Sequence, residues 1–142
     1  MTSTRDSSPA SFELRPIGVI RSTLRARDQA PRQGGEGAPD AWLEIEAWAG
    51  DAVDGLAVGD EILVLTWLHQ ADRGVLKVHP RGDTRNPLAG VFATRSPDRP
   101  IPVGLHPVSI RAIDVSGPGH RLLVGPIEAI DGTPVIDVKP AL

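Results

Sequence analysis

The 142-residue sequence contains no cysteine. This absence excludes disulfide bonds, thiolate metal sites and a cysteine nucleophile, and it is consistent with a cytosolic protein. Long apolar runs are also missing, because no segment approaches the ~20 residues that a membrane-spanning helix needs. Residues 1–11 are small and polar where a secretory signal would be apolar. We therefore expect a disordered leader at residues 1–11, one domain at residues 12–142 and a cytoplasmic location.

Sequence motifs with a known chemistry are also absent. The sequence has no phosphate-binding loop, no G-x-G-x-x-G, no H-E-x-x-H and no G-x-S-x-G. The four histidines do not have the spacing of metal ligands, so we predict no metal site and treat them as surface or hydrogen-bonded residues.

The sign of the charge changes along the chain, although the net charge is only −3. Residues 37–71 contain seven acidic residues and no Lys or Arg, whereas residues 73–99 contain six basic residues and two acidic ones. The basic residues are Arg73, Lys77, Arg81, Arg85, Arg95 and Arg99. They fit either solvated strand faces with local salt bridges or a positive surface for phosphate, and composition alone leaves both interpretations open.

Short β-branched runs alternate with glycine- and proline-containing turns, which predicts an all-β fold. Residues 61–68 are almost continuously apolar, which predicts a central strand buried on both faces. The strand candidates are residues 12–22, 42–48, 61–68, 75–78, 90–93, 108–115, 121–124 and 135–138. One or two helical turns are expected near residues 49–56. Seven or eight short strands favour a closed barrel or a sandwich, because closure leaves no sheet edge exposed.

Three segments carry unusual polar chemistry. Residues 26–40 form a long loop rich in Gly, Arg, Gln and Pro, and such loops are commonly functional or mobile. Residues 90–105 lead from an apolar run into two arginines and three prolines, a stiff path suited to contacts with an anionic ligand. In residues 131–140, Asp137 and Lys139 share one face of a strand, either as part of a site or as an exposed ion pair beside a turn.

Five sequence motifs follow one another in a familiar order. They are PIGVIRS at 16–22, PRQ at 31–33, GL at 55–56 with the apolar run 62–69 that ends in His, GVFATRSP at 90–97 with RP and PVG at 99–104, and DGTPVIDVKP at 131–140. In this order they resemble the TsaA-like (TrmO) family. The resemblance implies a single-sheeted closed β-barrel that acts as a homodimer and binds S-adenosylmethionine near the subunit contact. It also implies methylation of N6 of N6-threonylcarbamoyladenosine at position 37 of tRNA.

Candidate residues follow from matching these motifs. The resemblance implies cofactor contacts at Arg32, Gln33, Gly34, Gly35, His69, Gln70, Arg95, Leu105, Gly125, Pro126, Ile127 and Glu128. On the acceptor side the candidates are Asp131, Asp137 and Lys139, with Asp131 or Lys139 assisting loss of the proton from the methylated nitrogen. A tRNA partner makes Arg73, Lys77, Arg81, Arg85 and Arg99 candidate phosphate contacts.

The sequence departs from the family pattern at several positions. Glu61 stands where the family commonly has His, Ile101 replaces the Asn of RPNPIG, and Ala141 stands where Tyr follows KP. The chain stops at Leu142, so we expect it to lack the extra C-terminal domain that helps some bacterial members to hold tRNA.

Three functions therefore stay open from the sequence: a tRNA methyltransferase, a methyltransferase of the same fold that acts on a small molecule, and a non-catalytic module that binds S-adenosylmethionine. The arrangement of charge separates the first two. One surface formed by the bases of residues 73–99 favours tRNA, whereas interleaved acids from residues 37–71 favour a small molecule.

Overall fold

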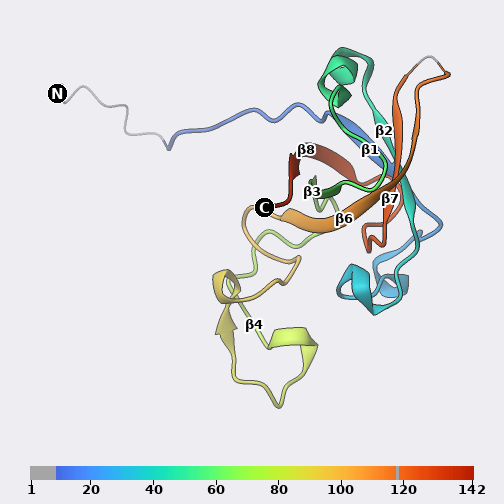
Figure 1. Ribbon diagram of the computed structural model, residues 1–142. Helices are drawn as coiled ribbons and strands as arrows, with labels where there is room; N and C mark the ends of the chain where they lie inside the picture. Colours follow the sequence, from blue (N-terminus) through green and yellow to red (C-terminus); the bar gives the residue numbers. More distant parts are fainter. Residues whose placement is uncertain (1–8, 118) are drawn as a thin grey trace.

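Six antiparallel strands close into one barrel in the computed structural model, which describes residues 9–117 and 119–142 (Figure 1). Around the barrel the order is β1-β2-β7-β6-β3-β8, and β8 pairs with β1 to close it. The strands are β1 (Gly18–Arg21), β2 (Ala41–Ile45), β3 (Glu61–Trp67), β6 (Val103–Asp114), β7 (Arg121–Gly125) and β8 (Pro134–Pro140). A separate pair consists of β4 (Lys77–Val78) and β5 (Ala89–Gly90). The predicted all-β closed barrel is confirmed, with six of the eight described strands in its wall.

Alternation along each strand builds the core. In β2 every second residue from Ala41 to Ile45 is buried, and β3 alternates in the same way, with Val64 fully buried and Leu65 half-buried. The prediction that residues 61–68 are buried on both faces is wrong, because only the inward face of a barrel strand reaches the core. The largest fully buried side chains are those of Ile20, Leu43, Ile62, Ile110, Leu122 and Ile127.

Several strand predictions need correction. The strand expected at 42–48 ends at Ile45, with Ala47 and Trp48 in the 3-10 helix Ala47–Val53, and of residues 75–78 only Lys77–Val78 forms a strand. Residues 90–93 form a strand only up to Gly90; Val91–Ala93 is the 3-10 helix η5, in which the backbone N–H and the hydroxyl of Thr94 both donate to Val91 O. The strand expected at 108–115 begins earlier, at Val103, and includes Pro107 opposite Leu63. Proline is compatible with this extended backbone because its φ of about −65° lies in the extended region.

The remaining helices are single 3-10 segments in the connections. They are η1 (Arg27–Gln29), η2 (Gly34–Glu36), η3 (Ala47–Val53) and η4 (Pro80–Gly82). The expected helical turns near 49–56 correspond to η3, and the long loop 26–40 contains η1 and η2. Within the described residues, no helix has the length and apolarity to cross a membrane. Of the predicted leader, residues 1–8 lie outside the described residues, and residues 9–11 are exposed and belong to no strand or helix.

The connection between β3 and β6 projects away from the barrel (Figure 1). It spans residues 68–102 and carries β4, η4, β5 and η5. Leu68 N–H donates to Pro102 O at 2.8 Å, directly beyond the Trp67–Val103 pair of the β3–β6 ladder. The two ends of this excursion therefore meet at the rim of the barrel, and we call residues 68–102 the projecting segment.

Candidate functional site

The PRQ loop (residues 31–35) packs against the turn at the end of β7 (residues 125–128). A Cβ added at Gly34 would lie 2.6 Å from Pro126 O and 3.2 Å from Glu128 Oε2, so only glycine allows this close approach. Ile127 N–H donates to Pro39 O at 3.0 Å and strengthens the same contact. Two of the segments that were predicted to bind the cofactor, residues 32–35 and 125–128, are therefore in direct contact.

A buried polar chain runs inward from this turn. Glu128 Oε1 lies 2.5 Å from His106 Nδ1, and His106 Nε2 lies 2.7 Å from the hydroxyl oxygen of Thr66. His106 is 3% exposed and Thr66 is fully buried, whereas the Glu128 side chain keeps 20% of its surface exposed. Glu128 thus links the surface of the turn to the interior of the barrel.

A second group of predicted residues lies where β3 ends. His69 and Gln70 follow β3 and are exposed. Arg27 in η1 donates to Gln70 O at 2.9 Å and pairs with Asp98 at 3.0 Å. Asp98 also accepts a hydrogen bond from Asp72 N–H at 2.8 Å. Arg27 therefore ties the end of β3 to the stiff arginine-rich segment that sequence analysis singled out.

The long loop 26–40 joins these two groups. Its η1 contacts the end of β3, its η2 contacts the turn after β7, and Glu36 of η2 pairs with Arg81 of the projecting segment at 2.8 Å. Arg32 is exposed, with one guanidinium nitrogen 3.1 Å from where a Cβ on Gly82 would lie. The expectation of a functional loop is consistent with this position at the centre of the candidate site.

Two further predicted cofactor residues are exposed. Leu105 points out of the barrel from β6 opposite Leu65 and is 40% exposed. Arg95 follows η5 on the projecting segment and is also exposed. No hydrogen bond or ion pair in the described residues joins either side chain to the turn at 125–128.

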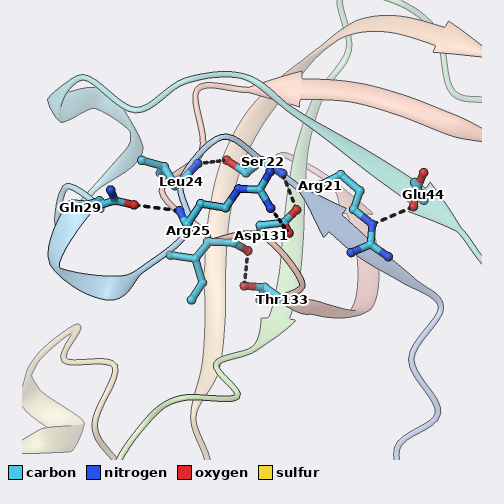
Figure 2. A network of polar contacts seen from close by, with 9 residues as sticks. Arg21, Ser22, Leu24, Arg25, Gln29, Glu44, Asp131 and Thr133 are labelled. Atoms are coloured by element: carbon cyan, nitrogen blue, oxygen red, sulfur yellow. Dashed lines mark hydrogen bonds and ion pairs between the residues drawn. The ribbon is translucent and has the colours of Figure 1, made fainter.

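The three acceptor-side candidates occupy two places. Figure 2 shows Asp131 between Ser22 and Arg25: its carboxylate accepts from Ser22 N–H at 3.0 Å and from Arg25 at 3.2 Å. This carboxylate lines a shallow hollow with Arg21, Asp40 and Trp42, among others. Asp137 and Lys139 instead form an ion pair of 3.3 Å on the outer face of β8. Within the described residues, no hydrogen bond or ion pair joins Asp131 to that pair.

The basic residues of 73–99 gather on the projecting segment, apart from the acids of 37–71. Of those acids, Glu44 pairs with Arg21 at 3.0 Å and Asp40 lies 3.7 Å from Arg111. Within the segment, Arg85 pairs with Asp83 at 2.7 Å and holds the pKa of that carboxyl below its ordinary value. Arg73 donates to Pro100 O and lies over the Trp67 ring, and Arg99 donates to Thr94 O and Ser96 O. Within the described residues, no ion pair joins the bases of 73–99 to the acids of 37–71.

Three residues of the site were missed by sequence reasoning: Arg27, Thr66 and His106. Thr66 and His106 face inward on neighbouring strands, two residues out of register across the β3–β6 ladder. Their contact depends on β6 beginning at Val103, which the sequence did not indicate. In the structure burial alternates through Gly104, His106 and Val108, but the sequence alone does not show this alternation.

Fold and site together define a small antiparallel β-barrel domain with its polar segments gathered around one long loop. The sequence matches the family described as the tRNA-methyltransferase O N-terminal domain over residues 19–142. A probable S-adenosyl-L-methionine-binding protein of Methanothermobacter thermautotrophicus is 44% identical over 133 residues, covering 94% of this chain and 92% of the relative. The tRNA (adenine(37)-N6)-methyltransferase of Escherichia coli strain K12 is 36% identical over 139 residues, covering 94% of this chain and 59% of the relative.

A solved structure agrees with these sequence relatives. The crystal structure of TrmO from Pseudomonas aeruginosa matches with a TM-score of 0.72 at 30% identity, covering 94% of this chain and 57% of that one. The chain belongs to the TrmO N-terminal domain family, as the motifs predicted. It spans a little under three fifths of the length of the E. coli and P. aeruginosa proteins.

Proposed function

We propose that this protein is an S-adenosylmethionine-dependent methyltransferase that methylates N6 of N6-threonylcarbamoyladenosine at position 37 of tRNA. The observation that carries the proposal is the contact between the PRQ loop and the turn at 125–128, in a chain of the TrmO family. The name of the E. coli relative, a tRNA (adenine(37)-N6)-methyltransferase, supports the choice of substrate.

The residues around this contact fit the chemistry of the cofactor. S-Adenosylmethionine has a carboxylate, an ammonium group, ribose hydroxyls and an adenine ring. Arg32, Gln33 and Arg95 are donors suited to the carboxylate, and the partly exposed Glu128 is an acceptor suited to the ammonium group or the hydroxyls. A Cβ added at Gly35 would meet nothing within 4 Å, so the backbone there borders open space.

Catalysis in this proposal consists mainly of alignment. The cofactor supplies an activated methyl group, and the protein holds the acceptor nitrogen in line with it. The amide-like nitrogen must also lose its proton, for which Asp131 and Lys139 are the two candidates. Asp131 is oriented by Ser22 and Arg25, and Lys139 by Asp137. Replacing each in turn, as Asp131→Asn and Lys139→Met, separates them by the loss of turnover at unchanged cofactor affinity.

The projecting segment is the proposed tRNA contact. The bases already assigned to it, Arg73, Lys77, Arg81, Arg85 and Arg99, lie on one excursion from the barrel. Phe92 in η5 is 85% exposed among them. An exposed aromatic ring beside basic side chains is typical of surfaces that stack unpaired RNA bases and contact phosphates. The anticodon loop is a single-stranded target of this kind.

A homodimer is part of the same proposal. The outer face of the barrel carries Leu63, Leu65 and Trp67 on β3, all only half-buried, and the 40% exposed Leu105 beside them. Contact of this apolar face with a second copy would remove it from water. Sedimentation velocity of the wild type and of Leu65→Glu tests this, since a dimer that uses this face dissociates in the variant. The proposed substrate places the protein in the cytoplasm.

The decisive experiment measures methylated nucleosides in tRNA. Mass spectrometry of tRNA from cells with and without the gene should show loss of N6-methylated threonylcarbamoyladenosine without it. Purified protein with labelled cofactor should restore the product in tRNA from the deletion strain. Arg32→Ala should abolish the transfer, whereas the control Arg15→Ala, which removes only a stack on Trp48, should keep it.

Each alternative function has its own outcome in this experiment. Unchanged tRNA together with labelling of a small-molecule fraction would replace the tRNA substrate. The exposed Ile101, at the position of the family's Asn, is the observation that favours this second candidate. Cofactor binding without labelling of any cellular fraction would indicate a non-catalytic binding module.

A further inference from the structure

The hydrogen-bonded side chains of Thr66, His106 and Glu128 occupy a space that Gly104 keeps open. Gly104 lies opposite Thr66 in the β3–β6 ladder. A Cβ there would lie 2.7 Å from His106 Nε2 and closer still to the Thr66 hydroxyl oxygen. The buried polar contact between Thr66 and His106 therefore depends on a residue without a side chain.

The hydrogen bonds select one form of the imidazole ring. Glu128 Oε1 accepts from Nδ1–H, because a carboxylate has no proton to donate in its ionised form. Nε2 then accepts from the Thr66 hydroxyl, for which the described residues offer no other acceptor. This arrangement gives the Thr66 hydroxyl and both ring nitrogens a partner, with the ring proton on Nδ1.

The second oxygen of Glu128 is directed toward the PRQ loop. Oε1 is engaged by His106, whereas Oε2 lies 3.2 Å from where a Cβ on Gly34 would be. A free carboxylate side chain on a short loop samples several rotamers, and restricting it to one of them on binding costs conformational entropy. The bond to a buried, rigid imidazole removes that freedom before any ligand arrives.

We propose that His106, held in one tautomer by Thr66, is a positioning residue that fixes Glu128 so that Oε2 accepts a hydrogen bond from the cofactor. This role rests on the proposed function, because it requires S-adenosylmethionine beside the PRQ loop. The donor is an N–H or O–H group of the cofactor: the ammonium of its methionine part or a ribose hydroxyl.

Calorimetric titration tests this role without turnover. The probes are S-adenosylhomocysteine, which has both donors, and methylthioadenosine, which keeps the ribose but lacks the ammonium group. Glu128→Gln and His106→Leu should each weaken S-adenosylhomocysteine binding about tenfold, the scale of one charge-assisted hydrogen bond. An equal loss for methylthioadenosine identifies a ribose hydroxyl as the donor, and no loss identifies the ammonium group.

Conservative variants distinguish positioning from a structural role. The amide nitrogen of Asn can replace Nδ1–H, so His106→Asn should stay within about threefold of wild-type affinity. Thr66→Val keeps the shape of the side chain but removes the hydroxyl, and it should weaken binding, whereas Thr66→Ser should not. Nitrogen NMR of the ring should show Nδ1 protonated in the wild type. Unfolding temperatures of each variant establish that it is folded.

The outcomes separate this role from the proposed function. Wild-type affinity in a folded His106→Leu variant, or a ring protonated on Nε2 alone, overturns the positioning role. If His106→Leu does not fold, wild-type affinity in Thr66→Val together with an unchanged ring spectrum has the same meaning. A wild-type protein that binds neither probe overturns the proposed function, and the positioning role with it.

Discussion

Replacing Gly104 by alanine should destabilise the barrel although it adds a single methyl group. Gly104 is buried on β6 and adopts an ordinary extended backbone, so the space around it is the only obstacle. The added Cβ would meet His106 Nε2 at 2.7 Å and Leu68 Cδ2 at 3.0 Å, with the Thr66 hydroxyl nearer still. Thr66 and the His106 ring are both buried in the barrel and have little freedom to move aside.

The size of the effect follows from three contributions. Overpacking of a filled interior costs about 1–3 kcal/mol. Loss of the hydrogen bond between Thr66 and His106 adds about 1 kcal/mol. Alanine lowers the conformational entropy of the unfolded chain relative to glycine, which stabilises the folded state by about 0.4–1 kcal/mol. The expected net loss in free energy of unfolding is about 2 kcal/mol, which lowers the melting temperature of a domain of this size by roughly 6 °C.

Thermal and urea denaturation followed by circular dichroism measures this loss. Gly117→Ala is the matched control, because a Cβ at Gly117 would meet nothing within 4 Å. The control should melt within about 2 °C of the wild type, as surface substitutions generally do. A Gly104→Ala protein as stable as this control would refute the reasoning, since it would mean that β3 and β6 have room for the methyl group.

Three further predictions test other parts of the structure. Arg121 holds the pKa of Asp114 below its ordinary value, so this carboxylate stabilises the fold above about pH 4 and less as the pH falls further; the deficit of Asp114→Asn in urea midpoint should therefore shrink on acidification. Leu43→Ala empties a fully buried position and should cost about 2–5 kcal/mol in urea unfolding. Lys77→Ala should reduce the slope of log affinity for tRNA against log salt by about 1 in filter-binding assays, and Arg85→Ala by less, because its charge is already paired.

The sequence predicted the barrel because apolar and polar residues alternate in short strands such as residues 42–45. It failed for residues 61–68, where half-buried leucines on the outer face look the same in sequence as core residues. Prolines also misled the assignment of β6, since Pro102 precedes the strand and Pro107 lies within it, and hydrogen bonding to β3 nevertheless stabilises the strand. Local composition cannot report such long-range pairing.

The candidate site was predictable as segments but not as contacts. The resemblance assigned residues 32–35 and 125–128 to the same cofactor pocket, and the structure shows Gly34 against Pro126. The hydrogen bonds of His106 to Thr66 and Glu128 could not be predicted, because they require an inward-facing residue of β6 to lie next to an inward-facing residue of β3. Asp131, Asp137 and Lys139 shared one motif, yet the strand carries them to different surroundings. Proximity in a motif is therefore a weak guide to proximity in a site.

The closed base of the projecting segment makes its outer part, between Gln70 and Arg95, an exchangeable module. Because the ends meet at the bond from Leu68 to Pro102, the barrel wall is complete without anything beyond them. The entropy of closing such a loop changes by only about 0.6 kcal/mol for each doubling of its length. Evolution or an engineer can therefore lengthen, shorten or recharge this outer part, and so change which acceptor is recognised, while the barrel stays unaltered.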